Sequence, residues 1–510
     1  MLLARKLKSA FQLYRRRGWT SLAGLAQVRT AALYRANRPV PLDPSRRTRL
    51  LATTLNRWSG VSTVAIDQVD LNCVRDTLLV PYLRSRFGEV VQTAAGLKSL
   101  QPVEIAVVAD SMLSTWDFSH LDDALPDWTE AVAETKFAVR IAQTARRTAL
   151  RLGRLHEADR PVPGSAEDVG ALLLRGDVSD ALGRMEDASK AYEAAVRRNG
   201  CDPHARRSLG FHLIKAGRVL DGLASWSVAD TLSGSYPLRY HRPRWTGEPL
   251  GPRRLMVLFE HGLGDMIQMA RFLPRLLERE PDATVLGLVP GPLAGLLSRA
   301  FPGVAFLTDE DREPDYDFFL PSMQLPSVLD AADLEPLTDY IDLGAPATMG
   351  RRRPRIGVCW RGHPRQYEMT RSVPLELFST LFSMRDVDFV VLLNRVHPDE
   401  AVVLAGFEDV EVPAIRDFVE LAGIVASCDL VVSVDTAVVH LAAAGGVPVL
   451  LMSRPDSCWR WGATGSRSPW YDTVEVLRHG GDMDWPRMLA AVKHRIRERC
   501  GARTLVSAGS

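Results

Sequence analysis

The sequence lacks the cysteine pairs, the charge excess and the long apolar runs that define several classes of protein. Six cysteines are spread over 510 residues with no CxxC pair, which excludes a disulfide scaffold and a zinc ribbon and fits a reducing cytosol. Basic and acidic residues nearly balance, 63 against 61, so charge gives no argument for nucleic-acid binding by the whole chain. The longest apolar stretch, near residues 425–452, contains Asp429, Asp435 and His440, so no membrane-spanning helix is expected there.

Basic charge is concentrated instead near the N-terminus. Residues 1–50 hold twelve Lys or Arg and a single acid, Asp43, with leucine and aromatic residues between them at roughly helical spacing. The pattern is typical of an amphipathic helix on an anionic membrane surface, and also of a solvated basic helix packed on the protein body, which we favour. An uninterrupted apolar core and a small-residue cleavage site are both missing, so we expect no secretory signal. Residues 51–168 predict a mostly helical region with no assigned role.

The segment 169–236 matches itself at an offset of 34 residues. The matching pairs are Gly176 with Gly210, Gly183 with Gly217, Tyr192 with Trp226 and Ala195 with Ala229. Small residues at fixed offsets let antiparallel helices approach closely, and we expect the aromatic residue to fill the groove between neighbouring pairs. The spacing resembles the tetratricopeptide repeat, a helix–turn–helix unit whose arrays usually bind peptides or proteins. An ordinary helical bundle is the alternative.

Residues 252–349 predict an α/β lobe that begins with a glycine-rich turn. The apolar run Leu255–Phe259 is typical of a buried parallel strand, and Gly262-Leu263-Gly264-Asp265 follows it, then a helix over Met266–Leu277. Glycines at such a turn let the backbone approach a ligand, and the helix start offers free N–H groups. Asp265 is either a reactive carboxylate or a simple cap of that helix. Further strands are expected over Thr284–Val289, Val304–Thr308 and Tyr316–Leu320, with a helix over Pro292–Ser298.

Residues 353–499 predict a second α/β lobe. Its expected strands are Ile356–Trp360, Val387–Leu393, Leu430–Val434 and Val447–Met452, with a helix over Phe418–Ala426. Two such lobes place a ligand cleft between the carboxyl ends of their strands. Asp435-Thr436-Ala437 marks a helix start whose N–H groups and threonine hydroxyl suit a diphosphate oxygen, and His440 lies on nearly the same helix face. Capping alone is the alternative.

A basic loop follows the first strand of this second lobe. It carries Arg361, Arg365 and Arg371, and guanidinium groups match phosphate oxygens bidentately, so the loop suits a polyanionic ligand. A solvated basic loop is the alternative. Tryptophans at positions 459, 461 and 470 either stack a base or sugar ring or cover the end of the sheet, and the sequence favours neither.

Taken in order, these motifs resemble those of bacterial tetratricopeptide-repeat glycosyltransferases related to the ADP-heptose:lipopolysaccharide heptosyltransferases of glycosyltransferase family 9. The resemblance covers about residues 170–499. The runs that carry it are Pro243-Arg244-Trp245, Glu260-His261-Gly262-Leu263-Gly264-Asp265-Met266-Ile267-Gln268, Phe272-Leu273-Pro274, Arg371-Ser372-Val373-Pro374, Ser433–Leu441 and Trp459–Tyr471. The sequence departs from the family pattern at His261, Met269 and Ala444-Gly445-Gly446, which leaves the donor open.

The resemblance implies a GT-B fold: two Rossmann-like lobes, with a nucleotide-sugar bound mainly by the C-terminal lobe. It also implies inverting transfer without a metal or other cofactor, and it makes Asp265 the general base. Donor binding is expected from Gly262, Gly264, Arg361, Arg371, Asp435, Thr436, Ala437 and His440. An inverting transfer needs a base for the acceptor hydroxyl and positive charge for the leaving diphosphate, and these residue types supply both.

The sequence therefore predicts an inverting, metal-independent glycosyltransferase that moves a sugar from a nucleotide-diphosphate sugar to a glycan or protein acceptor. The helical repeats are expected to help acceptor recognition. Two alternatives stay open: a non-catalytic repeat scaffold whose GT-B module only binds a nucleotide-sugar, and a nucleotide-sugar epimerase or hydrolase on the same fold. The predicted location is cytoplasmic, with peripheral contact at the inner face of the plasma membrane through the basic segment, and no nucleic-acid partner.

Overall fold

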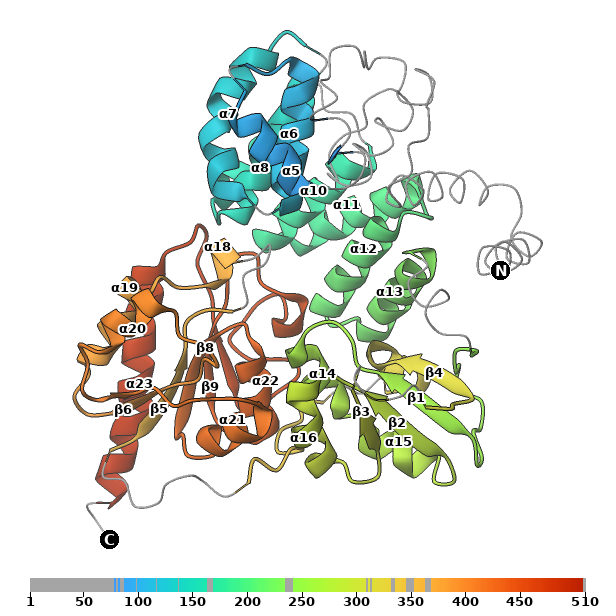
Figure 1. The fold of residues 1–510 in the computed structure, drawn as a ribbon, viewed down its shortest axis with the longest axis vertical. Coiled ribbons are helices and arrows are strands. Elements are labelled where there is room, and N and C mark those ends of the chain that lie inside the picture. Colours follow the sequence, from blue (N-terminus) through green and yellow to red (C-terminus); the bar gives the residue numbers. More distant parts are fainter. Residues whose placement is uncertain are drawn as a thin grey trace. The chain divides into compact units, whose positions relative to one another are not determined.

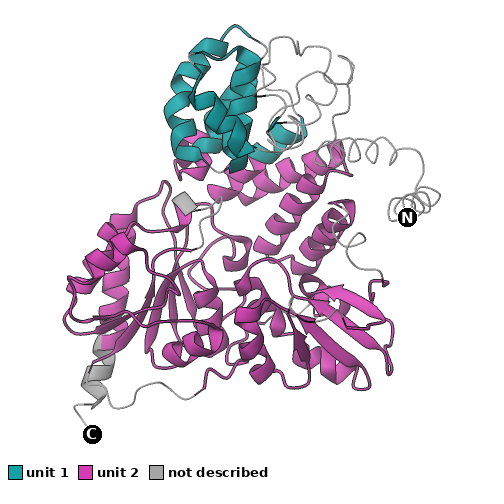
Figure 2. Cartoon of the chain, in the orientation of Figure 1, with its two compact units in different colours: residues 1–149, 160–174 teal, residues 150–159, 175–510 magenta. Residues whose placement is uncertain are grey.

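The computed structural model describes most of the chain beyond residue 78 (Figure 1). The described residues are 78, 81–82, 87–97, 99–115, 117–135, 137–162, 168–233, 242–308, 311, 314–331, 335–344, 353–362 and 368–507. The chain divides into two compact units, residues 1–149 with 160–174 and residues 150–159 with 175–510 (Figure 2). The basic segment 1–50 and Arg365 lie outside the described residues, so the predictions made for them stay predictions.

The first unit is a group of helices in which α6 (Pro102–Thr115) is largely buried. Its helices are α5 (Phe87–Ala95), α6 (Pro102–Thr115), α7 (Phe118–Val132) and α8 (Ala138–Arg151), the last two residues of which belong to the second unit. Helix α6 buries most of its side chains, including the acid Asp110. Asp110 accepts a hydrogen bond from the Tyr82 hydroxyl and lies 3.7 Å from the Arg140 guanidinium. The buried charge is therefore compensated, as burial in an apolar core requires.

Two helix–turn–helix pairs follow, as the 34-residue offset predicts. They are α10 (Val169–Ala181) with α11 (Met185–Arg198) and α12 (Pro203–Lys215) with α13 (Val219–Ser233), preceded by the short α9 (Leu155–Ala158). Gly183 and Gly217 occupy the two turns with φ of +74° and +85°, a conformation that other residues rarely adopt. Asp202 caps α12 by accepting the Ala205 N–H at 2.9 Å. The repeated glycines thus end the first helix of each pair at the same point.

The repeated aromatic residue packs against the glycine of its own pair, a contact that the prediction did not include. A Cβ at Gly176 would lie 2.5 Å from the Tyr192 ring, and one at Gly210 would lie 2.7 Å from a backbone oxygen of α13 and 3.2 Å from the Trp226 nitrogen. Each glycine makes room for the partner helix, because packed interiors leave no space for an added methyl group. Tyr192 does reach the next pair, with its ring 5.3 Å from that of His212.

The first lobe is a four-stranded parallel sheet in the order β3-β2-β1-β4 (Figure 1). Its elements are β1 (Arg254–Leu258), α14 (Leu263–Ala270), α15 (Leu273–Arg279), β2 (Thr284–Leu288), α16 (Gly291–Ala300), β3 (Ala305–Leu307), β4 (Phe318–Pro321), the 3-10 helix η3 (Ser322–Gln324) and α17 (Leu325–Val328). The single helix predicted over Met266–Leu277 is wrong, because α14 ends at Ala270 and α15 starts at Leu273. Pro274 explains the break, since its ring would clash with the Ala270 carbonyl and it has no N–H to donate.

The second lobe is a six-stranded parallel sheet in the order β10-β9-β8-β5-β6-β7. Its elements are β5 (Arg355–Cys359), α18 (Glu368–Arg371), α19 (Leu375–Phe378), η4 (Ser379–Ser383), β6 (Asp388–Val391), α20 (Pro398–Leu404), β7 (Val410–Glu411), α21 (Phe418–Val425), β8 (Leu430–Val434), α22 (Ala437–Ala444), β9 (Val449–Met452), η5 (Trp459–Trp461), β10 (Val474–Leu477) and α23 (Trp485–Ser507). In both lobes the first strand lies between the second and the fourth, which is the doubly wound Rossmann order. The predicted fold class, a GT-B type pair of Rossmann-like lobes after a helical region, is confirmed.

One apolar core joins the second helix pair to both lobes. It contains Ile214, Leu223 and Trp226 from α12 and α13 together with Trp245 ahead of β1 and Trp461 of the second lobe. Helix α12 also packs against η5, and α13 packs against η3 and α17. The last helix pair is therefore part of the same packed body as the lobes. Within the described ranges, no helix combines the length and the apolarity needed to cross a membrane.

Candidate active site

In each lobe, candidate residues follow the strand at which the strand order reverses. Strand β1 lies between β2 and β4, and Gly262 and Asp265 come directly after it. Strand β5 lies between β6 and β8; Arg361 follows β5, and Asp435-Thr436 follows β8. The carboxyl ends of the strands at such a switch point form the crevice in which open α/β sheets bind ligands. The fold therefore brings the predicted motifs to the place where a ligand site is expected.

Asp265 connects the two lobes through an ion pair. Its side chain is buried in the first turn of α14, and its Oδ2 accepts the Gly262 N–H at 3.0 Å. Its Oδ1 accepts a hydrogen bond from Nε of Arg460, at 2.6 Å, and a second from the same guanidinium. Arg460 belongs to η5 of the second lobe. Asp265 thus caps its helix with one oxygen and forms an ion pair across the lobe boundary with the other.

This ion pair decides the charge state of Asp265. Burial alone would raise the pKa of the carboxyl group, but the nearby Arg460 and His261 outweigh burial, so the pKa lies below its ordinary value. The carboxylate is therefore ionised at neutral pH. While Arg460 holds it, however, it is a weak proton acceptor, because a general base works best when its pKa lies near the working pH.

Arg460 is a site residue that the sequence analysis missed. Its guanidinium lies over the Trp459 ring, 4.4 Å from the centroid, and its Nη1 lies 2.7 Å from the Cys458 sulfur. The charges of Asp265 and Asp435 both raise the pKa of the Arg460 guanidinium, so the arginine stays charged. The sequence does show an arginine between two tryptophans in the run 459–461. Its partner Asp265, however, lies 195 residues away in the chain, so the ion pair could not be predicted from this pattern.

Gly264 brings α14 against α22 of the other lobe. A Cβ at this position would lie only 2.4 Å from Cδ2 of His440, so only glycine allows this approach. His440 is buried, and its Nδ1 lies 3.0 Å from the Tyr471 hydroxyl. Burial, reinforced by Arg460, lowers the pKa of His440 to about 4. The imidazole is therefore neutral at ordinary pH and is packed at the lobe boundary.

The start of α22 keeps its first N–H groups free of a side-chain cap. Thr436 is the N-cap residue, yet its hydroxyl makes no capping hydrogen bond and instead lies 3.1 Å from the Ser433 hydroxyl and 3.7 Å from the Cys359 sulfur. Ala437 is the first residue of the helix. The N-terminus of a helix attracts anions, and this one sits at the switch point of the second lobe.

The two predicted arginines lie at the same end of the sheet but are engaged with protein groups. Arg361 binds Glu400 with Nε at 2.7 Å and Nη2 at 2.9 Å, and also donates to the Arg395 carbonyl at 2.6 Å. The Arg371 guanidinium packs over Gly362, where a Cβ would lie 2.5 Å from its central carbon. The structure thus places both arginines beside the β5 loop, with Arg361 already paired to a carboxylate.

The three tryptophans lie buried in the core that the lobes share, which favours the covering role over the stacking of a ligand ring. Trp470 offers its carbonyl to Nη1 of Arg271, a first-lobe residue, at 2.8 Å. The Arg271 guanidinium lies 5.8 Å from the ring centroids of Tyr340 and Trp470 and 5.9 Å from that of Tyr471. Aromatic rings around this one cation fix the two lobes against each other.

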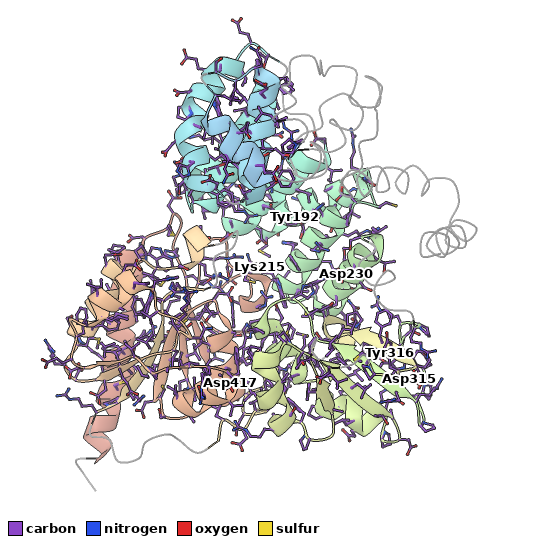
Figure 3. All side chains as sticks on the ribbon, in the orientation of Figure 1. Tyr192, Lys215, Asp230, Asp315, Tyr316 and Asp417 are labelled. Atoms are coloured by element: carbon purple, nitrogen blue, oxygen red, sulfur yellow. The ribbon has the colours of Figure 1, made fainter. Side chains whose placement is uncertain are left out.

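The turn after β1 is strained and is covered by the last repeat helix. His261 has φ of +71°, in the left-handed region that non-glycine residues rarely occupy and that often marks functional sites. Its ring contacts Trp226 of α13 with centroids 4.9 Å apart. Asp230, labelled on α13 in Figure 3, is buried, and burial together with the charge of Glu260 raises its pKa. The repeat helices therefore contribute a carboxylate and an aromatic ring to the surroundings of Asp265.

Helices α14 and η3 carry buried polar atoms without hydrogen-bond partners. Among the described residues, the Gln268 amide, the Ser322 hydroxyl and Nε2 of Gln324 have none, and all three side chains are buried. Helix η3, which holds Ser322 and Gln324, packs against α14 at the carboxyl end of β4. Unsatisfied buried polar groups are rare in proteins and usually bind water or a ligand. The sequence analysis quoted Gln268 only as part of a motif.

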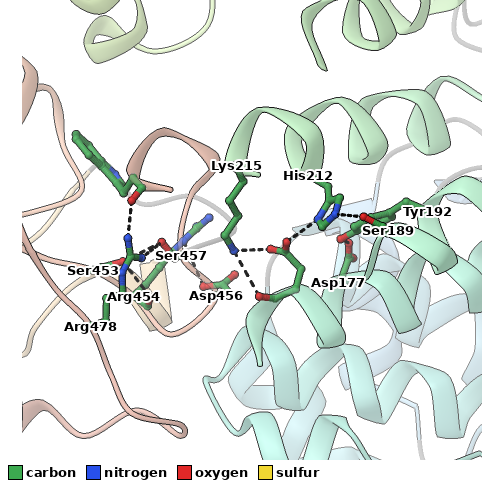
Figure 4. Close-up of polar contacts among 12 residues, drawn as sticks. Asp177, Ser189, Tyr192, His212, Lys215, Ser453, Arg454, Asp456, Ser457 and Arg478 are labelled. Atoms are coloured by element: carbon green, nitrogen blue, oxygen red, sulfur yellow. Dashed lines mark hydrogen bonds and ion pairs between the residues drawn. The ribbon is translucent and has the colours of Figure 1, made fainter. Parts of the chain in front are cut away.

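A second polar cluster lies within the helix pairs (Figure 4). His212 contacts Asp180 with Nδ1 at 2.9 Å and the Ser189 hydroxyl with Nε2 at 2.7 Å, which resembles the bonding order of a serine-hydrolase triad. Lys215, however, binds the same Asp180 carboxylate at 2.5 Å, and its charge together with the His212 hydrogen bond lowers the pKa of Asp180, which burial would raise. A carboxylate already neutralised by lysine cannot stabilise an imidazolium, so the cluster connects α10, α11 and α12 as a packing network.

Comparison with known proteins supports the class of protein that this fold and site define. Residues 400–480 match the model of glycosyltransferase family 9 (heptosyltransferase). Protein FlbA of Caulobacter vibrioides is 26% identical to this chain over 340 residues, which cover 58% of this chain and 56% of FlbA. This chain thus spans about half the length of that curated relative. The resemblance to family 9 heptosyltransferases that the sequence motifs predicted is confirmed.

Solved structures with partial similarity include several heptosyltransferases. The Escherichia coli ADP-heptose lipopolysaccharide heptosyltransferase II is 17% identical, with a TM-score of 0.36 over 50% of this chain and all of that one. The E. coli heptosyltransferase WaaC with ADP-2-deoxy-2-fluoro heptose is 15% identical, with a TM-score of 0.36 over 48% of this chain and 99% of that one. The fold assignment rests on the strand orders and not on these similarities.

Proposed function

We propose that this protein is an inverting glycosyltransferase that moves a sugar from a nucleotide-diphosphate sugar to a hydroxyl group of a glycan or protein acceptor. In this proposal Asp265 is the general base. The N-terminus of α22 and Arg460 supply positive charge to the leaving diphosphate, and the helix pairs help to recognise the acceptor. The predicted cytoplasmic location and the membrane contact of the basic segment belong to the same proposal.

One observation carries the proposal: a carboxylate from one switch point meets a cation from the other lobe. Asp265 follows β1, Arg460 lies in η5 between β9 and β10, and Nε of Arg460 is 2.6 Å from Oδ1 of Asp265. A transferase needs a base on the acceptor side and positive charge on the donor side, within reach of one bound sugar. The match of residues 400–480 to family 9 supports the same chemistry for the second lobe.

Asp265, Arg460 and the start of α22 can account for each bond and proton of the transfer step. The acceptor oxygen forms a bond to the anomeric carbon from the face opposite the leaving group, which inverts the configuration. The bond from that carbon to the diphosphate oxygen breaks, and the electron pair leaves with the diphosphate. Asp265 takes the proton of the acceptor hydroxyl, and Arg460 with the α22 N–H groups stabilises the charge that develops on the diphosphate.

The acceptor side is supported by the groups around α14. The unsatisfied polar atoms of Gln268, Ser322 and Gln324 match the hydrogen-bonding needs of hydroxyl-rich or peptide ligands. Asp230 and Trp226 of α13 stand beside the β1–α14 turn, so a partner held by the helix pairs would approach the base from this direction. The contribution of the last repeat helix to this side favours a role of the repeats in acceptor recognition.

A donor screen tests the proposal directly. Purified protein is incubated with ADP-, UDP-, GDP- and CMP-linked sugars, with ADP-heptoses first because residues 400–480 match a heptosyltransferase family. Binding is followed by thermal shift, and transfer of labelled sugar to glycan and protein fractions of a cell extract is followed by mass spectrometry. We expect one donor class to bind and to label an acceptor fraction.

Asp265→Asn should still bind the donor and lose at least about a thousandfold in transfer, because the base is removed while Arg460 and the α22 N-terminus remain to bind the diphosphate. Asp315→Asn is the matched control, since Asp315 is an exposed carboxylate of the same lobe (Figure 3). Absence of binding across the whole donor panel would contradict the proposal. Binding without any transfer would favour a scaffold, and donor consumption without an acceptor would favour an epimerase or hydrolase.

A further inference from the structure

The ion pair between Asp265 and Arg460 leaves the proposed base with no free oxygen. Oδ2 accepts the Gly262 N–H at 3.0 Å, and Oδ1 accepts two donors of the Arg460 guanidinium. The carboxylate is also buried, being 5% exposed. An acceptor hydroxyl has to hydrogen-bond the base before it can lose its proton. Both acceptor sites of Oδ1 are taken by Arg460, so this oxygen cannot accept the hydroxyl in this arrangement.

Arg460 is the group that has to leave, because the Gly262 contact belongs to the helix cap. The Arg460 side chain is 17% exposed, against 5% for that of Asp265, so it is the more accessible partner. It is flanked in sequence by the buried side chains of Trp459 and Trp461, which anchor the backbone of η5. A rotation of the arginine side chain alone is therefore the smallest movement that frees the base.

A bound diphosphate would attract the Arg460 guanidinium away from Asp265. It carries more negative charge than a single carboxylate and offers several oxygens to the planar guanidinium. Its expected position is the start of α22. This helix lies against α14 next to the ion pair, because a Cβ at Gly264 would lie 2.4 Å from Cδ2 of His440, and Asp265, the next residue, binds Arg460 at 2.6 Å. Binding of the donor therefore competes with Asp265 for the same cation.

We propose that Arg460 is a positioning residue that couples donor binding to the release of the base. Without donor, it holds Asp265 in an unreactive ion pair across the lobe boundary. With donor, it moves to the diphosphate and frees Oδ1 of Asp265 for the acceptor hydroxyl. This inference rests on the proposed function and adds an order to it: the donor binds first, and only then is the base able to accept a proton.

A double-mutant cycle on diphosphate binding tests the exchange. ADP, UDP and GDP are titrated by calorimetry into the full-length wild type, Arg460→Gln, Asp265→Asn and the double variant. Arg460→Gln should weaken the diphosphate that binds by about 10- to 100-fold, since a charge-assisted contact is lost. Asp265→Asn should strengthen it by about 3- to 10-fold, because the diphosphate no longer has to break the ion pair.

The double variant separates two possible causes of the higher diphosphate affinity of Asp265→Asn. If the gain comes from release of Arg460, it disappears once residue 460 is glutamine. If it comes only from removing a negative charge near the diphosphate, it persists, and the inference is overturned. Arg416→Gln, which breaks an exposed ion pair with Glu420 in the same lobe, is the matched control and should leave binding unchanged. Thermal unfolding of every variant shows that each has folded.

The outcomes also separate this inference from the proposed function. No binding of any nucleoside diphosphate to the wild type contradicts the proposed function itself. Equal binding by the wild type and Arg460→Gln refutes the exchange and the contact of Arg460 with the diphosphate, while sugar transfer with Asp265 as the base still stands. A structure with bound diphosphate in which Arg460 still contacts Asp265 refutes it as well.

Discussion

Replacing Gly264 by alanine tests the packing of the two lobes at the candidate site. The added Cβ would lie 2.4 Å from Cδ2 and 3.1 Å from Nε2 of His440, whereas carbon atoms in contact normally stay about 3.5–4.0 Å apart. Helices α14 and α22 would therefore have to separate by about 1 Å, or His440 would have to leave its contact with Tyr471. Overpacking of this kind costs about 1–3 kcal/mol, so the free energy of unfolding should fall by that amount in urea denaturation.

A second glycine provides the matched control. Gly423 lies inside helix α21 of the second lobe, and a Cβ there would meet nothing within 4 Å. Gly423→Ala should therefore stabilise the protein by about 0.4–1 kcal/mol, because alanine loses less chain entropy on folding.

His440→Ala removes the atoms that clash, so the cost of Gly264→Ala should nearly vanish in the His440→Ala background. If Gly264→Ala is as stable as the wild type, or if its cost is unchanged without the imidazole, the close approach of the two lobes is not as described.

Three further predictions concern buried charged groups. Lowering the pH from 6.5 towards 4 should destabilise the protein by about 3 kcal/mol through His440, because the pKa of its imidazole is near 6.5 in the unfolded chain and about 4 in the folded protein. Urea denaturation at several pH values measures this dependence of the free energy of unfolding on pH. The dependence should become weaker by this amount in His440→Gln, and an unchanged dependence refutes the burial argument. Lys215→Met should cost about 3 kcal/mol at neutral pH. The cost should shrink as the pH falls below 3.8 towards the lowered pKa that Asp180 has in the folded wild type, and a difference that is constant with pH contradicts the pairing. Glu400→Gln should cost about 1.5–3 kcal/mol by breaking the ion pair with Arg361, and a neutral result in thermal unfolding contradicts the observed bidentate contact.

Most strands could be predicted from the sequence because buried parallel strands are continuous apolar runs. Residues 430–434 were predicted as a strand and form β8, and the predicted run 255–259 is shifted by one residue from β1, which spans Arg254–Leu258. The strands β7 and β10 were missed, and both lie at the edges of the sheet. Strand β7 has only two residues, and β10 alternates buried and partly exposed side chains, so neither shows an apolar run.

The candidate site could be predicted only where local chain chemistry defines it. Asp265 and Thr436 stand at strand-to-helix turns that glycine, aspartate and threonine mark in the sequence. The role of Arg460 depends on a contact across 195 residues, and the burial of His440 depends on the glycine of another lobe. Such contacts follow from how the lobes pack together, and no short-range pattern records that packing.

The core that joins α12 and α13 to the lobes has a consequence for protein engineering. Trp459 contacts Phe211 and Trp226 of these helices, and it stands directly before Arg460. A chain trimmed to the two lobes would leave this tryptophan in water, so we expect it to aggregate and to lose the orientation of the neighbouring arginine. Exchanging the helices for those of a relative would require the tryptophan and its surroundings to be exchanged with them. The repeat helices of this protein therefore cannot be removed or exchanged independently of the two lobes.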